Sequence, residues 1–158
     1  GDSVVTNPTF AMNATTASTS AQTTTGTFGA NDKRIAVDNP GGANNGWTLT
    51  LNATTPGTGK WTSGSNTYQY NGNATTGQLT VNPAAGTLTS MIGASTGITL
   101  GSQAAFSGTS PVTLISAAAG SDDVWRGYLT GVGLSQAIPA GQAAGTYTLP
   151  MTQTVAAI

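Results

Sequence analysis

The sequence predicts an all-β protein, an antiparallel β-sandwich of jelly-roll or immunoglobulin-like type with no substantial helix. The segment Gly46-Trp47-Thr48-Leu49-Thr50-Leu51 alternates large apolar residues with Gly or Thr, which is typical of a strand with one buried face. Turn residues (Gly, Pro and Asn) recur about every 8 to 15 residues, a spacing that favours a sandwich or barrel. No window combines apolar residues at helical spacing with a recognisable cap.

The first 25 residues differ in character from the rest of the chain. Residues 3–13 are predicted to be extended, with Asn7 and Asn13 on one face and four apolar residues on the other: Val4, Pro8, Phe10 and Met12. Pro8 lacks an N–H group and so favours an edge position. Residues 14–25 form a Thr/Ser/Ala-rich stretch with little to bury. We therefore expect an N-terminal strand and linker over 1–25 and a sandwich domain over 26–158.

Within the predicted domain, a strand is expected to begin near Thr27, and a weak alternation through Ile35 and Val37 leads to a Gly-rich turn at 39–46. The Trp47 strand follows. Further strands are predicted over residues 66–70, 78–81, 87–91, 97–100, 104–106, 112–116 and 124–138. The last strand is predicted near 146–155, where Gln153 interrupts an apolar face formed by Tyr147, Leu149, Met151 and Val155.

Composition narrows the class of protein. A chain of 158 residues is expected to form one domain that buries roughly 70% of its unfolded surface. Only 6% of the residues are charged and the net charge is −1, so nucleic acid is not an expected partner. The chain has no Cys, and no apolar run approaches the roughly 20 residues of a membrane span. We interpret it as a secreted protein of the cell surface, with Gly1 a processed start.

The reactive side chains that most enzymes use are missing. The sequence contains neither His nor Glu, which removes the usual general bases, Ser-His-Asp arrangements and most metal ligands. We therefore predict a protein that is not an enzyme and has no cofactor. The adjacent Asp122 and Asp123 are a weak Ca²⁺ candidate, but they lack the spaced ligands of a calcium loop, which favours a solvated turn.

Other polar and aromatic residues leave alternatives open. Three Asn-Ala-Thr sequons, at Asn13, Asn52 and Asn73, are candidate N-glycosylation sites, although a chain rich in Asn and Thr also produces such triplets by chance. Lys33 and Lys60 are either exposed lysines or partners in an intramolecular crosslink. Trp61, in a Gly/Ser/Thr-rich region, is a candidate for an exposed carbohydrate platform, whereas the alternation around Trp47 favours core packing.

The motifs together resemble the WxL-type surface domain of Gram-positive bacteria over roughly residues 27–156. The resemblance rests on the following segments: Val37-Asp38-Asn39, Gly46 to Leu51, Val132-Gly133-Leu134, Ile138-Pro139-Ala140 and Ala144 to Tyr147. It implies a secreted β-sandwich associated with the cell wall, with Trp47 and Leu49 as the first Trp-x-Leu motif. Tyr147 matches the start of the family's last strand, but Gln153 stands where the family has a second Trp, followed by the apolar Val155.

Two functional hypotheses follow. The first is an extracellular structural subunit that polymerises into a pilus-like filament, with the N-terminal strand of one copy completing the sheet of the next. Its partners are other copies of the same chain. The alternative is an adhesive module that binds cell-wall polysaccharide or another carbohydrate, in which residues 3–13 pair with their own sheet.

Overall fold

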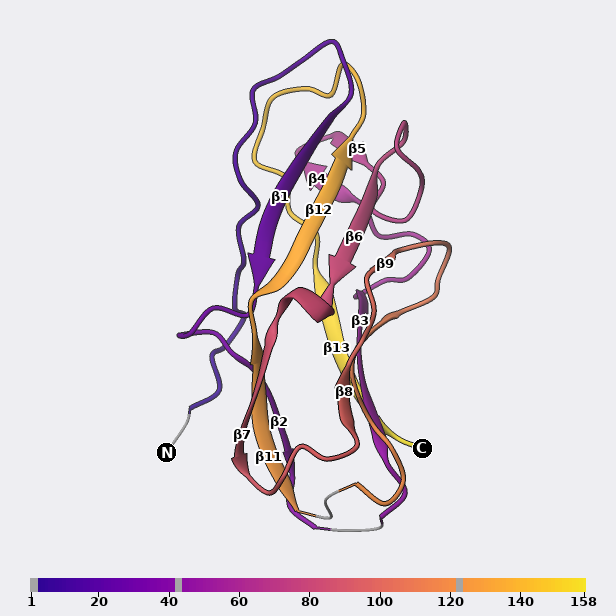
Figure 1. Cartoon of the computed structure of the whole chain (residues 1–158). Helices are drawn as coiled ribbons and strands as arrows, with labels where there is room; N and C mark the ends of the chain where they lie inside the picture. Colours follow the sequence, from indigo (N-terminus) through magenta and orange to yellow (C-terminus); the bar gives the residue numbers. More distant parts are fainter. Residues whose placement is uncertain (1–2, 42–43, 122–123) are drawn as a thin grey trace.

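The structure is a computed structural model that describes residues 3–41, 44–121 and 124–158. It confirms the predicted all-β class: antiparallel sheets pack together as in a β-sandwich, and the described residues include a single short 3₁₀ turn at Pro83–Ala85. The molecule is elongated along its strands (Figure 1). No helix among the described residues is long and apolar enough to cross a membrane.

One layer contains two consecutive sheets. The upper sheet has the order β1 (Gln22–Phe28), β12 (Val132–Ile138), β6 (Gln78–Asn82) and β9 (Ala104–Ala105). The lower sheet has the order β2 (Ile35–Asn39), β11 (Trp125–Thr130) and β7 (Thr87–Ile92). Only Gly131, at φ +75°, separates β11 from β12. A positive φ is accessible to Gly at little cost, so this residue lets the chain bend from one sheet into the other.

The second layer has the order β13 (Met151–Ala157), β3 (Trp47–Ala53), β10 (Val112–Ala117) and β8 (Ile98–Leu100). A hairpin of β4 (Trp61–Ser63) and β5 (Asn66–Tyr68) lies outside both layers near the upper end (Figure 1). Backbone hydrogen bonds between Thr62 and Thr148 join this hairpin to the segment that leads into β13. The last strand is therefore held at its start as well as along β3.

The core lies between the layers. Along β3 every second residue, from Trp47 to Ala53, is buried. The Trp47 ring packs at 5.7 Å from that of Trp125, which comes from the opposite layer and is fully buried. Burying a large apolar side chain contributes about 1.5–3 kcal/mol, so the alternation that predicted the strand also accounts for its contribution to stability.

Several boundaries differ from the expectations. The predicted strand at 124–138 is two strands joined at Gly131, and the last strand begins at Met151 instead of near Thr146. β1 starts at Gln22, inside the predicted linker, because its pairing with β12 begins there, with Gln22 opposite Ile138. Residues 3–13 form no regular strand: the chain bends at residues 6–7, and the segment pairs with β1 through an isolated bridge between Met12 and Gly26. The β4 strand was not expected from the sequence.

Candidate functional site

The N-terminal segment, residues 3–13, lies along the free edge of β1. Met12 forms an antiparallel bridge with Gly26, and the Asn13 N–H donates to the Thr25 carbonyl at 2.7 Å. The Asn13 amide also donates to the Thr25 hydroxyl at 3.0 Å, and the Thr24 hydroxyl donates to the Asn13 carbonyl at 2.5 Å. The hydrogen-bonded attachment of the segment to the sheet is therefore confined to residues 12 and 13.

Two side chains fasten the segment below this bridge. The Phe10 ring meets the buried Phe28 edge-on, with ring centroids 4.6 Å apart. Lys33 donates from Nζ to the Thr9 carbonyl at 3.0 Å, and its ammonium lies 5.9 Å from the centroid of the Phe10 ring. Farther toward the N-terminus, Val4 is 95% exposed. Of the four predicted assembly residues, Phe10 and Met12 thus contact their own β1, whereas Val4 and Pro8 are exposed and line a groove described below.

A groove of about 600 Å³ runs beside this segment. One wall is the N-terminal segment itself, from Ser3 to Phe10, and the floor is formed by β2 and the neighbouring strand β11. Arg126 and Tyr128 alternate with buried residues of β11 and so face outward, while Gln153 of β13 reaches the groove from the second layer. The groove therefore meets the edge strands β2 and β13, where the two layers of the sandwich come to an end.

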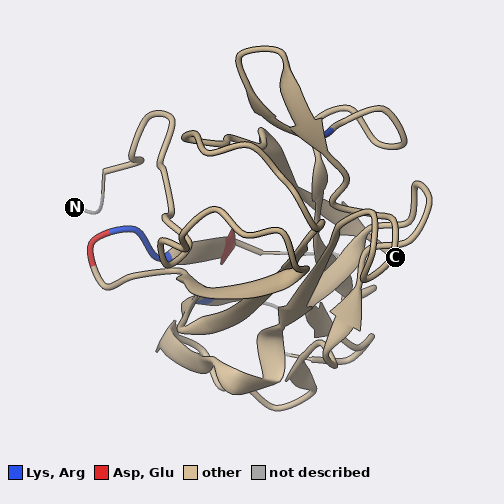
Figure 2. Cartoon of the chain, turned by 90° about the horizontal axis from the view of Figure 1, so that it is seen from above, with Lys and Arg blue, Asp and Glu red and all other residues tan. Residues whose placement is uncertain are grey.

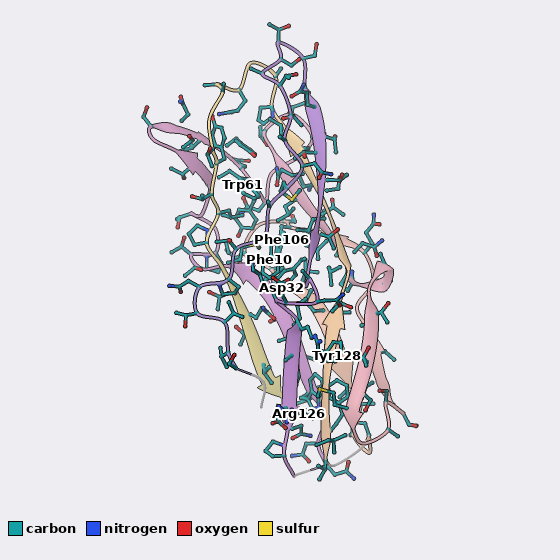
Figure 3. The ribbon with its side chains drawn as sticks, turned by 90° about the vertical axis from the view of Figure 1, so that its left-hand side faces the viewer. Phe10, Asp32, Trp61, Phe106, Arg126 and Tyr128 are labelled. Atoms are coloured by element: carbon teal, nitrogen blue, oxygen red, sulfur yellow. The ribbon has the colours of Figure 1, made fainter. Side chains whose placement is uncertain are left out.

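Charge is concentrated in this groove. The whole chain has four basic and five acidic residues. The groove is lined by Asp32, Lys33, Arg34, Asp38 and Arg126. The Arg34 guanidinium stacks 4.4 Å from the centre of the Tyr128 ring, and Arg126 lies 4.0 Å from Asp38. The loop of residues 32–34 projects on the same side of the molecule as the N-terminus (Figure 2), and Phe10, Asp32, Tyr128 and Arg126 lie along that side in Figure 3. The sequence predictions missed this cluster, although three consecutive charged residues at 32–34 stand out in a chain with so few charges.

The flank formed by β13 is open. This strand ends its sheet, and its residues Gln153 and Val155 pair with Leu51 and Leu49 of β3. Residues opposite each other on neighbouring strands point to the same face, so Val155 points to the core side of the sheet. It is nevertheless 56% exposed, whereas Leu49 is 2% exposed. Nothing among the described residues covers the inner face of β13 fully.

The residues of the Trp-x-Leu resemblance occupy different environments. Trp47, Leu49 and Leu51 are buried in the core, and Leu149 and Met151 pack against it while remaining partly exposed. Tyr147 lies before β13 and packs on Tyr68 at 5.1 Å. The expected core position of Val155 is wrong, because it lies on the open flank. The structure does place the first motif and the Gln153–Val155 segment on adjacent strands.

An aromatic cluster joins the β4–β5 hairpin to the body. Trp61 stacks on Tyr68 with ring centroids 6.1 Å apart, and the Trp61 indole donates to Oε1 of Gln136 at 2.8 Å. Gln136 is fully buried in β12, which alternation alone did not indicate. Burial, followed by the charge of Tyr147, raises the pKa of Tyr68 to about 12. Trp61 is partly buried, so only part of its ring remains accessible.

The three sequons differ in their hydrogen bonds. The Asn52 amide donates to the Thr109 carbonyl, and its oxygen accepts from the hydroxyl of the buried Tyr70 at 3.1 Å. The Asn13 amide donates to Thr25. Asn73 is exposed, and its side-chain oxygen accepts from the backbone and hydroxyl groups of Thr75 and Thr76. This loop orders the Asn73 side chain through its oxygen.

The remaining candidates concern metal binding and crosslinking. Asp122 and Asp123 lie outside the described residues, and within the described ranges no group of three or more His, Cys, Asp or Glu side chains is placed to hold a metal ion. Lys60 is exposed, and the Lys33 ammonium binds a backbone carbonyl. Neither observation places a Lys beside a crosslinking partner in the described part of the chain.

Comparisons with protein-family models, with curated proteins and with solved structures find no match for this chain.

Proposed function

We propose that this chain is a structural subunit of an extracellular, pilus-like filament, in which copies join by pairing of β-strands. The observation that carries the proposal is the open flank of the sandwich. β13 ends its sheet with its core-facing side exposed at Val155, and a groove joins this flank to the β2 edge. An unpaired strand edge is a template for another chain, so these edges are the natural place for a second copy.

The N-terminal segment supports the same proposal. It forms one wall of the groove, and its apolar Val4 and Val5 are 95% and 44% exposed. A contact between an extended segment of one copy and an edge of another is heterologous, and such contacts propagate when they do not close into a ring. The low charge of the rest of the surface lets identical copies approach without strong repulsion.

Sedimentation velocity over a range of concentrations tests this proposal. The unmodified chain is expected to form large species as concentration rises. Phe10→Asp should abolish them while leaving the monomer folded, because Phe10 anchors only the N-terminal segment to Phe28. Thr9→Asp is the matched control, since it adds the same charge at an exposed neighbouring position. Assembly by Phe10→Asp equal to that of the control would contradict the proposal.

A carbohydrate-binding module of the cell surface is the second candidate. The observation that favours it is the aromatic cluster in which the partly exposed Trp61 and Tyr147 pack around the buried Tyr68, since aromatic faces suit sugar rings. The test is retention on insoluble cell-wall polysaccharide, which Trp61→Ala should abolish. Equal retention of the variant would remove this candidate.

A further inference from the structure

We propose that the strand exchanged between copies is residues 3–13, which leaves the β1 edge of its own chain and takes the equivalent place on a second copy. This rests on the proposed function and adds to it the donor segment, the hinge and the receiving surface. The alternative donor is the C-terminal strand β13, which pairs along its whole length with β3.

The short attachment of the N-terminal segment makes it the better donor. Its sheet pairing consists of the Met12 bridge to Gly26 and the Asn13 hydrogen bonds to Thr24 and Thr25. By contrast, β13 keeps register with β3 from Met151 to Ala157 and ends in a further hydrogen bond from Ile158 to Gly46. Fewer contacts must break for residues 3–13 to leave than for β13.

Residues 14–21 provide a hinge. They include no strand up to Ala21, and all are exposed except the half-buried Ser18, whose carbonyl accepts one backbone hydrogen bond from Gly141. Extended at about 3.3 Å per residue, this stretch spans roughly 26 Å. A stretch of that length lets the segment swing away from the β1 edge of its own chain. Residues 14–21 have few apolar side chains to bury, so burial favours no single conformation of this stretch.

The receiving surface is the one that the segment already occupies within its own chain, and it borders the groove that reaches the open flank, since Phe10 and Lys33 line that groove. Phe28 receives the Phe10 ring, Lys33 binds the Thr9 carbonyl, and Thr25 pairs with Asn13. Every copy carries the same surface, so the contacts made between copies reproduce those made within one. Exchange of this kind needs no further complementary surface between copies, and rising protein concentration favours it.

Engineered disulfides test the exchange, because the chain has no Cys of its own. Asn13→Cys with Thr25→Cys joins the segment to the β1 edge at exposed positions where the native side chains are 3.0 Å apart. Thr54→Cys with Thr152→Cys is the matched control, since these exposed hydroxyls are also 3.0 Å apart but join β13 to the residue that follows β3. Each variant is assembled while reduced, checked for fold by circular dichroism, then oxidised and run on a denaturing gel without reductant.

The exchange predicts a ladder of covalent multimers from the Asn13/Thr25 pair and monomers alone from the Thr54/Thr152 pair. Filaments whose Asn13/Thr25 disulfide stays within each chain would overturn the exchange of residues 3–13 but would still support the proposed filament. A ladder from the Thr54/Thr152 pair alone would overturn it in favour of β13. Multimers that stop at a dimer would support the exchange but contradict the filament, and a chain that remains monomeric at every concentration would overturn both.

Discussion

The indole of Trp61 donates to the side-chain oxygen of Gln136 at 2.8 Å, and this contact joins the β4–β5 hairpin to the upper sheet. Gln136 is fully buried, and its amide donates to the carbonyls of Gln69 and Ala137. A polar side chain is stable in the core only when its groups are paired. The Trp61 indole therefore helps to stabilise the buried Gln136 side chain, and Gln136 in turn helps to hold the hairpin in place.

Gln136→Leu should lower the free energy of unfolding by about 1–3 kcal/mol, because it leaves the Trp61 indole and the Gln69 carbonyl without this partner. Urea denaturation measures the effect. Gln103→Leu, at an exposed position, serves as the control and should change stability by less than about 0.5 kcal/mol. The effect of combining Gln136→Leu with Trp61→Phe should fall below the sum of the two single effects; additive losses would show that the two residues are not coupled.

Val155 and Leu49 face each other on adjacent strands but differ in burial. Leu49→Ala should cost about 2–5 kcal/mol because it leaves a cavity in the core. Val155→Ala should cost less than about 0.5 kcal/mol in the monomer, as expected of an exposed position. Thermal unfolding at a concentration where the chain is monomeric provides the comparison. A cost at Val155 close to that at Leu49 would mean that the β13 flank is covered in the monomer.

The raised pKa of Tyr68 predicts a loss of stability in alkali. Its phenol ionises near pH 10 in the unfolded chain but near 12 in the folded one, so its contribution is present below pH 10 and is lost as pH rises from 10 to 12. The melting temperature of the unmodified chain should fall through this range. Tyr68→Phe, which has no phenol to ionise, should fall less steeply. Identical slopes for the two proteins would argue against the buried phenol as the cause.

The sequons should differ as acceptors in the folded chain. We expect Asn73 to be modified most readily by an oligosaccharyltransferase, because it is exposed and its amide nitrogen makes none of the hydrogen bonds recorded for Asn13 and Asn52. Peptide mass spectrometry after treatment of the folded chain measures occupancy at each site. Thr75→Ala should remove modification of Asn73 alone. Greater occupancy at Asn52 than at Asn73 would contradict this ranking.

The sequence predicted the strands with one buried face best. Trp47 to Leu51 alternate cleanly, and burial in the structure follows that alternation because side chains on a strand point to opposite faces in turn. The bend at Gly131 was not predicted, since its cause is a single backbone angle inside residues 124–138, which the sequence pattern predicted as one strand. Val155 could not be distinguished from a core residue, because the pattern indicates which face a side chain occupies but not whether another layer covers it.

The candidate site was predictable only in part. The apolar spacing of Val4, Phe10 and Met12 predicted an extended segment, whereas the chain bends at Asn7, which has φ +47°. The contacts of the segment with Phe28 and Lys33 depend on the return of the chain along β1. Arg126 lies far in sequence from Asp38, and only the pairing of β11 with β2 brings them together. Contacts of this long-range kind follow from sheet register, which local patterns do not determine.

Negative-stain electron microscopy of the unmodified chain, prepared at increasing concentrations, tests the central claim most directly. The proposed self-assembly predicts filaments of uniform width whose number and length grow with concentration and which are missing from Phe10→Asp prepared in parallel. Uniform single particles at every concentration would contradict it.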